Sequence, residues 1–284
     1  MKASPKLIHS VIVLISAFAG WISPEIYGQD NVDWTLQPFS EALKLVKVYH
    51  SSDRLTFVLQ NSQEKIVTGY AACFSRGERF SSCHTSDWAT SDSLRGLARG
   101  EVDYLIIGDI EAAEYPNHIL RISAVLFEDG SSEGLYEDIM CIYLKRLGKA
   151  LESGREALIL SSFTNPSLSD VEITALANKI GPPIEKDSQL PDVLKDMEGY
   201  GITVPNVSDL SGIMRGSLES GISITRTQTL RDIDLFRKSL LSSTAAQGHI
   251  KIKTIEELMM QMKETASRLI ELSRQTEKQM KGKL

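Results

Sequence analysis

The sequence has few of the residues that most often bind metals or nucleotides. Only three cysteines and five histidines occur among its 284 residues. No Cys-x-x-Cys or His-Glu-x-x-His spacing is present, so no zinc motif is recognisable from local sequence. Glycine-rich phosphate loops of the two standard spacings are also missing, and Gly199-Tyr200-Gly201 is too short a match. We therefore expect no metal, no nucleotide and no other cofactor.

Positive charge is scarce as well. The 31 lysines and arginines are outnumbered by 37 aspartates and glutamates, which gives a net charge of −6. A protein of this charge repels a phosphate backbone unless its basic residues cluster on one surface. The basic residues after Lys251 are interleaved with glutamates, as in the pair Glu264 and Arg268, and this pattern is typical of a solvated helix. We expect no nucleic-acid partner.

Long hydrophobic runs are missing except near the N-terminus. Lys2 and Lys6 precede an apolar stretch over residues 7–15, and residues 17–19 offer the small-x-small pattern that signal peptidase recognises. The stretch is shorter than the about 20 apolar residues that a spanning helix needs. We therefore predict a signal peptide over residues 1–29 and export to the periplasm or out of the cell.

The mature chain is expected to begin between residues 20 and 30. Removing residues 1–29 takes away two lysines and one glutamate, which changes the net charge from −6 to −7. After cleavage we expect no membrane span. The alternative is an uncleaved N-terminal segment that anchors the protein to a membrane.

Alternating apolar residues predict strands in the first part of the chain. Leu55, Phe57 and Leu59 share one face of an extended segment over residues 54–60. The polar residues 61–65 connect it to a second extended run over residues 66–74. This arrangement predicts a hairpin with a five-residue loop.

Further strands and one long connection complete this region. Residues 75–100 are rich in Ser, Thr, Arg and Gly and are predicted to be a long polar connection. Strands that follow one another without helices predict an antiparallel β-sandwich, Ig-like in kind, over residues 30–130. The other predicted strands are residues 43–50, 102–110 and 118–127.

The hydrophobic period changes to three and four residues after residue 130, which predicts a helix from Leu135 to Leu158. Ser131 or Ser132 is the expected N-cap. Gly148 and Gly154 each weaken this helix by up to about 1 kcal/mol relative to alanine, so a break can occur there.

A linker near residues 163–168 precedes the remaining helices, the fourth of which is expected to stop at Gly248. The fold class is therefore α+β, with an all-helical region over residues 131–284. The helices are predicted at residues 168–180, 191–198, 208–220, 229–247 and 254–281.

Two of the three cysteines are spaced to form a disulfide. Cys73 and Cys83 would close a short loop in an oxidising compartment and stabilise the fold by about 2–3 kcal/mol. Cys141 lies beside Ile139 and Ile142 and is predicted to be a small buried hydrophobic residue. Three free thiols are the alternative, since an odd number is no disulfide framework.

Two short patterns match catalytic arrangements, and each has a simpler explanation. Cys83 and His84 with Asp87 supply a thiol, a base and a carboxylate. Adjacent side chains of an extended segment point to opposite faces, however, so a surface loop is expected. Ser62 and Lys65 match the Ser-x-x-Lys spacing of penicillin-recognising enzymes, but they fall in the predicted hairpin loop and Lys-Thr-Gly is absent.

An acidic turn precedes the first predicted helix. Glu128, Asp129 and Glu133 offer oxygens to calcium, but an EF-hand needs more ligands at fixed positions. Asp-Gly turn chemistry and the favourable position of acidic residues near a helix N-terminus explain these residues. Met259, Met260 and Met262 are predicted to form part of the core, with an adaptable binding surface as the alternative.

Two stretches resemble small β-sandwich domains of exported bacterial proteins of unknown function. The first is residues 55–68, and the second is residues 125–134 with the following helix, which bears Arg146. The resemblance covers roughly residues 43–150 and implies an exported sandwich joined to helices. It implies no catalytic residues, and residues 164–284 lie outside it.

These observations favour an exported binding or structural protein of the cell envelope or extracellular space, with a protein as partner. A sandwich is a generic binding scaffold. One alternative is a hydrolase whose residues converge from distant positions, with His84, His118 or Asp87 in a cleft between sheet and helices. The other is a membrane-anchored helical protein that binds a partner through its last helix. The sequence does not define an oligomeric state.

Overall fold

The structure is a computed structural model that describes most residues of the chain. The predicted signal peptide, His118, Gly248 and residues 164–167 of the predicted linker lie outside them. The described residues are 35–50, 54–76, 79–90, 96–108, 119–163, 168–185, 189–204, 206–208, 210–241 and 253–281.

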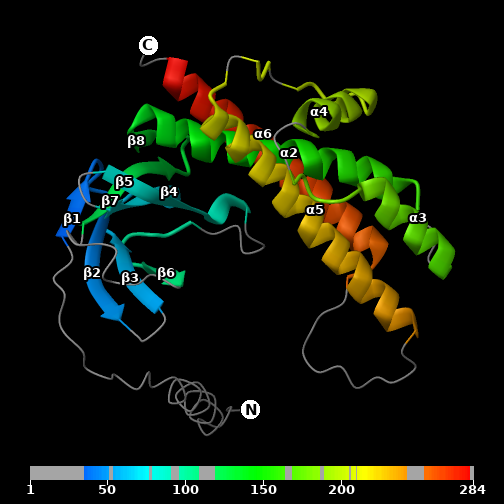
Figure 1. Cartoon of the computed structure of the whole chain (residues 1–284), viewed down its shortest axis with the longest axis horizontal. Helices are drawn as coiled ribbons and strands as arrows, with labels where there is room; N and C mark the ends of the chain where they lie inside the picture. The colour runs from blue at the N-terminus through cyan, green and yellow to red at the C-terminus, as the bar shows by residue number, and fades with distance from the viewer. Residues whose placement is uncertain are drawn as a thin grey trace, which may run out of the picture.

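The strands form two sheets (Figure 1). In the larger sheet the order is β1 (Thr35–Pro38), β7 (Ile119–Phe127), β4 (Val67–Arg76) and β5 (Arg79–Asp87), and β8 (Ser132–Gly134) also pairs with β7. The smaller sheet has the order β2 (Leu43–His50), β3 (Arg54–Asn61) and β6 (Val102–Gly108). The pair β1–β7 is parallel, so the larger sheet is mixed and not purely antiparallel as the sequence predicted.

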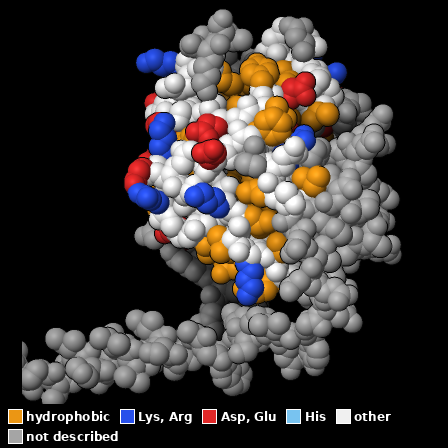
Figure 2. Space-filling view, turned by 90° about the vertical axis from the view of Figure 1, so that its left-hand side faces the viewer, with side chains coloured by type: hydrophobic (Ala, Val, Ile, Leu, Met, Phe, Trp, Pro, Cys, Tyr) orange, Lys and Arg blue, Asp and Glu red, His pale blue; other side chains and the backbone are white. Residues whose placement is uncertain are grey.

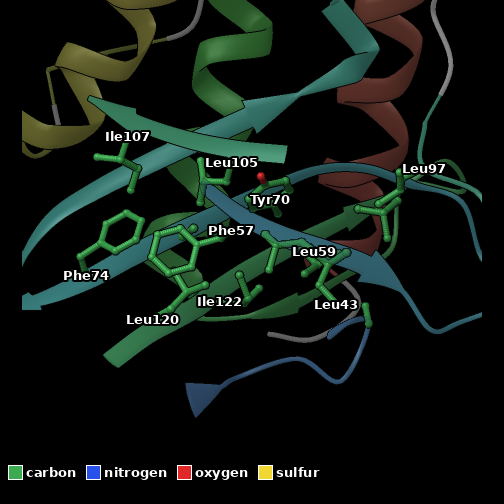
Figure 3. Packing of buried hydrophobic residues seen from close by; sticks show 14 of the residues in the cluster. Leu43, Phe57, Leu59, Tyr70, Phe74, Leu97, Leu105, Ile107, Leu120 and Ile122 are labelled. Atoms are coloured by element: carbon green, nitrogen blue, oxygen red, sulfur yellow. The ribbon is translucent and has the colours of Figure 1, made fainter. Parts of the chain in front are cut away.

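The two sheets share one hydrophobic core (Figure 3). The rings of Phe57 on β3 and Phe74 on β4 meet with centroids 5.3 Å apart. The alternation that predicted strand β3 is therefore real, since Leu55, Phe57 and Leu59 all point into this core. Other buried members are Leu43, Tyr70, Leu97, Leu105, Ile107, Leu120 and Ile122.

The predicted hairpin is wrong, because β3 and β4 belong to different sheets. The connection after Asn61 passes from one sheet to the other, and the Asn61 side chain holds it. Its Nδ2 donates to the carbonyls of Lys65 (2.9 Å) and Leu97 (2.7 Å), and its Oδ1 accepts from the amide of Gln63 (2.9 Å). Asn61 is 1% exposed, so these bonds replace those that water would make.

The predicted polar connection over residues 75–100 contains a strand and a short 3₁₀ helix, η2 (Trp88–Thr90). Strand β5 is an edge strand with a polar sequence, and β4 is the only one of the described strands that pairs with it. An edge strand can be polar because part of its surface faces water. Hydrophobic alternation was therefore too weak a signal to reveal it.

Five α-helices are described: α2 (Tyr136–Ser161), α3 (Asp170–Ile180), α4 (Leu190–Gly199), α5 (Gly212–Leu241) and α6 (Ile255–Lys281). The N-cap of α2 is Leu135, with no side-chain cap, because Ser132 belongs to β8. The predicted serine cap is therefore wrong. Helix α5 is one continuous helix where the sequence predicted two. No helix in the described ranges combines the length and hydrophobicity needed to cross a bilayer.

Helices α2 and α6 cover the outer face of the larger sheet. Ile139 and Ile142 of α2 and Met280 of α6 pack on Ala124 and Leu126 of β7. The α+β class, with sheets followed by a helical region, is thus confirmed. Sheet pairing extends beyond the predicted limit at residue 130 and ends with β8.

Helices α2 and α5 cross at two glycines. A Cβ on Gly148 would lie 2.2 Å from the Leu218 carbonyl oxygen, and one on Gly221 would lie 2.1 Å from the Lys145 carbonyl oxygen. The two backbones are therefore in direct contact. Gly148 does not break α2, as the sequence analysis had allowed, but forms this crossing.

The crossing predicts opposite effects for two glycine substitutions in α5. Gly221→Ala should destabilise the fold by about 1–3 kcal/mol, because backbone must move to admit the methyl group. Gly216→Ala, which meets nothing within 4 Å, should stabilise it by about 0.5–1 kcal/mol. Urea unfolding of both variants measures the difference, and equal effects would contradict a close crossing.

The Asn61 contacts predict a large effect of one amide. Asn61→Ala should lower the free energy of unfolding by about 3 kcal/mol, because it removes three hydrogen bonds of a buried side chain and takes from the Gln63 amide the acceptor that it has in Asn61 Oδ1. Asn178→Ala, at an exposed position of α3, serves as the control and should change stability by less than about 0.5 kcal/mol. Thermal and urea unfolding report both values.

Candidate binding groove at the sheet–helix junction

A groove of about 690 Å³ lies where the larger sheet meets the ends of α2 and α6. It brings together segments that are far apart in the sequence: the end of β1, the β3–β4 connection, β8, the start of α2 and the end of α6. Its lining residues are Phe39, Ser40, Glu41, Gln63, Ser132, Glu133, Gly134, Tyr136, Ile139 and Met280.

Hydrogen bonds hold the carboxylate of Glu133 in this groove. Ser40 Oγ donates to Glu133 Oε2 at 2.7 Å, and Gln63 Nε2 donates to Oε1 at 3.4 Å. Ser40 is 4% exposed and also accepts from the amide of Ala42 at 3.1 Å. The carboxylate position is therefore set by residues from two other segments of the chain.

Glycine at position 134 lets β8 approach β7 closely before the chain enters α2. Gly134 has φ +112°, a conformation that L side chains rarely adopt, and a Cβ would lie 2.2 Å from the Ser123 carbonyl oxygen. The amide of Leu135 then donates to the same carbonyl at 2.7 Å. This contact places Tyr136 at the groove edge.

The rim of the groove is apolar and exposed. Phe39 is 46% exposed and Tyr136 55%, and Leu135 beside them is 39% exposed. The guanidinium of Arg121 lies 5.0 Å from the centre of the Phe39 ring and covers part of it. Figure 2, which views the molecule from the β1 and β2 side, shows hydrophobic side chains gathered in a band down this face.

The groove thus combines aromatic surface with the carboxylates of Glu41 and Glu133. Its described lining contains no histidine, cysteine or lysine. Aromatic rings and carboxylates together favour a ligand that carries both an apolar group and a cation.

The structure separates the three residues of the predicted acidic turn. Glu133 lies in the groove, whereas Asp129 pairs with Lys65 Nζ at 2.8 Å and accepts from the Ser131 amide at 2.9 Å. Partial burial raises the pKa of Asp129, but the hydrogen bonds from Lys65 and Ser131 outweigh it and lower the pKa to about 2. Glu128 is exposed. In the described part of the chain, no group of three or more His, Cys, Asp or Glu side chains is placed to hold a metal ion.

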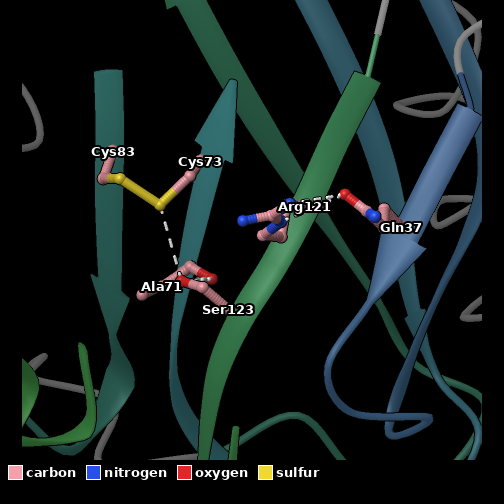
Figure 4. Close-up of a disulfide and its surroundings, with 6 residues drawn as sticks. All are labelled: Gln37, Ala71, Cys73, Cys83, Arg121 and Ser123. Carbon is pink, nitrogen blue, oxygen red and sulfur yellow. Dashed lines mark hydrogen bonds between the residues drawn. A yellow bond between two sulfur atoms is a disulfide. The ribbon is translucent and has the colours of Figure 1, made fainter. Parts of the chain in front are cut away.

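A disulfide joins Cys73 on β4 to Cys83 on β5, with an S–S distance of 2.08 Å (Figure 4). The two residues lie directly opposite each other in the antiparallel pair, so the bond ties the edge strand β5 to its only described neighbour. The third cysteine, Cys141, is a buried thiol on α2.

His84 and Asp87 lie on opposite sides of β5. The His84 ring meets Phe74 edge-on, with ring centroids 5.7 Å apart, whereas Asp87 pairs with Arg146 Nη2 of α2 at 2.9 Å. Arg146 is 1% exposed and also donates to Thr68 Oγ1 at 3.0 Å. Asp87 therefore ties the sheet to α2 and does not orient His84.

The Ser62–Lys65 pair and the methionine group, which the sequence also singled out, do not form sites in the structure. Ser62 Oγ donates to the Glu41 carbonyl at 2.6 Å, whereas Lys65 pairs with Asp129, so the two do not act together. Met262 is buried in the helical core and Met260 is 60% exposed. The methionine group is therefore divided between core and surface.

A network of buried charges crosses the helical region and was not predicted. Glu152 of α2 accepts from Arg155 Nη1 and from Arg226 Nε of α5, both at 2.8 Å, and all three side chains are at most 7% exposed. Glu156 is fully buried, and its Oε2 accepts from Thr229 Oγ1 at 2.6 Å. Charged residues spaced three and four apart on a helix usually indicate a solvated face. The sequence pattern therefore gave no reason to predict that these charges are buried.

Burial raises the pKa of Glu156 well above its ordinary value, and the neighbouring charge of Glu152 raises it further. Protonated Glu156 therefore contributes stability that is fully present below the unfolded pKa and is lost as the pH rises through the folded pKa. Glu156→Gln should remove this loss, so the variant gains stability relative to the parent as the pH rises from 4 to 8. Urea unfolding at both ends of this range measures the gain, and Glu271→Gln on the exposed face of α6 is the control.

Comparison with known proteins supplies no further guide to this groove. No protein-family model matches the chain, and neither a curated protein nor a solved structure matches it. The groove and the residues that form it are therefore the basis for inferring a function.

Proposed function

We propose that this protein is an exported, non-catalytic binding protein that holds a cationic, partly apolar segment of a partner polypeptide in the groove. The observation that carries the proposal is the fixed carboxylate of Glu133 in a groove that the exposed side chains of Phe39 and Tyr136 also line. The predicted signal peptide and the acidic net charge support export and an affinity for cations.

The arrangement favours recognition over chemistry. Ser40 holds Glu133 before any ligand arrives, so little ordering entropy opposes binding. Aromatic rings give large contact area at low conformational cost, and they attract cations through their faces. Glu41 adds a second negative charge at the same groove.

We also propose that the scaffold of the groove is an Ig-like sandwich. Two facing sheets with a shared core support an Ig-like sandwich, the kind of domain that the resemblance of residues 43–150 implies. Helices α2 and α6 close one face of it, and the groove lies at the end of the contact between sheet and helices.

The charge preference of the groove tests this function. The dipeptide amides Arg-Trp and Glu-Trp are titrated separately into the isotopically labelled protein, and backbone NMR signals of Ser132–Gly134 are followed. We expect Arg-Trp to shift these signals and Glu-Trp to leave them unchanged. Glu133→Gln should weaken Arg-Trp binding by about two- to fivefold, as expected for one partly exposed ion pair.

Glu198→Gln, at the exposed end of α4, is the control variant and should bind like the parent. Added salt should weaken Arg-Trp binding, because the interaction is partly ionic. Equal binding of both dipeptides, or shifts confined to residues away from the groove, would contradict the proposal.

A further inference from the structure

Strand β6 is an edge of the smaller sheet and lacks the features that usually protect an edge. Exposed edges are commonly blocked by lysine, proline, a bulge or very short length. Strand β6 has seven residues, Val-Asp-Tyr-Leu-Ile-Ile-Gly, and pairs with β3 without a register shift. Among the described strands, none pairs with its other side.

The other described edges are protected. Strand β2 carries Lys44 and Lys47 and has a register shift between Leu45 and Lys47. Strand β1 has four residues and ends in Pro38. Strand β5 carries charged residues and is crosslinked to β4 by the disulfide. Strand β6 therefore differs from the other described edge strands, because its edge is available for pairing with another strand.

The outward face of β6 is apolar. Tyr104 is 57% exposed, Ile106 55% and Val102 37%, while the alternate residues Leu105 and Ile107 point into the core (Figure 3). The only charged residue of the strand, Asp103, accepts a hydrogen bond from the Tyr70 hydroxyl at 2.8 Å. No charge of this strand therefore opposes an apolar partner on the outward face.

We propose that β6 pairs antiparallel with β6 of a second copy, so that two smaller sheets join into one continuous sheet. The strand is suited to itself as a partner, because each copy offers an edge of the same length with an uncharged outward face. Although the chain is acidic, the outward side chains that meet carry no negative charge.

The faces and the one charge restrict the pairing register, and we choose the register centred on Tyr104, the middle one of the three outward apolar residues. Residues opposite each other in an antiparallel pair point to the same face, so an outward residue must oppose an outward residue. Centring the two-fold axis on Asp103 would set two carboxylates side by side, which is unfavourable. Centring it on Tyr104 places Tyr104 opposite its copy, Val102 opposite Ile106, and Asp103 opposite Leu105.

Sedimentation of the purified chain tests the dimer. We expect a concentration-dependent dimer for the parent chain. Ile106→Lys should weaken dimerisation about tenfold or more, because a lysine on the edge strand would replace the apolar contact with Val102 of the second copy. The matched control Val171→Lys changes an apolar residue of α3 that is 77% exposed and should leave the dimer unchanged.

Crosslinking tests the register, in a Cys141→Ala background that leaves the native disulfide intact. Tyr104→Cys should give a covalent dimer on oxidation, because residue 104 opposes its copy. Val102→Cys alone should not, whereas a mixture of Val102→Cys and Ile106→Cys chains should. Circular dichroism confirms that each variant is folded.

A parent chain that stays monomeric at its highest soluble concentration would overturn the proposal. A dimer that Ile106→Lys leaves intact would overturn it as well, since the contact would then lie elsewhere. If Tyr104→Cys fails to crosslink in a folded dimer, the proposed pairing is wrong. None of these outcomes depends on the groove, so this test and the ligand titration can fail separately.

Discussion

Burial of both faces of the larger sheet is the constraint on which the rest of the structure depends. Its inner face packs on the smaller sheet and its outer face on α2 and α6. The central strands β4 and β7 are accordingly buried along almost their whole length, and not at alternate positions only. The helices complete this core, so the sheets and the helices form a single packed unit.

Polar side chains join the layers at positions where the apolar core ends. Asn61 directs the chain from one sheet to the other, and Arg146 reaches from α2 to Asp87 on β5. Both are nearly fully buried, and replacing either would remove hydrogen bonds that join separate elements. Such contacts act over short range and specify geometry more strictly than apolar packing does.

Much of the secondary structure could be predicted from the sequence, because hydrophobic periodicity reports directly which face of an element is buried. The strands around Phe57 and Leu120 and the helix from Leu135 illustrate this. Pairing could not be predicted in the same way, since the same alternation fits a hairpin and a connection between two sheets. The buried Asn61 side chain holds the connection, but its burial is a tertiary property that the sequence does not show.

The groove could not be predicted from the sequence either, because it is formed by tertiary contacts. Its residues come from five segments, and Phe39 and Glu133 are neither adjacent nor spaced by a recognisable motif. The sequence singled out Glu133, but as part of a turn with Asp129. The structure assigns these two carboxylates to different partners, which spacing alone does not reveal.

Helix α2 makes a different contact on each of several faces, and this has a consequence for how the sequence can vary. Ile139 and Ile142 contact the sheet, Gly148 contacts α5 and Glu152 meets Arg226. Each added residue rotates all later positions of a helix by about 100°. An insertion or deletion within the first three turns of α2 would therefore turn Gly148 and Glu152 away from their partners at once. The part of α2 from Ile139 to Glu152 must therefore keep a constant number of residues.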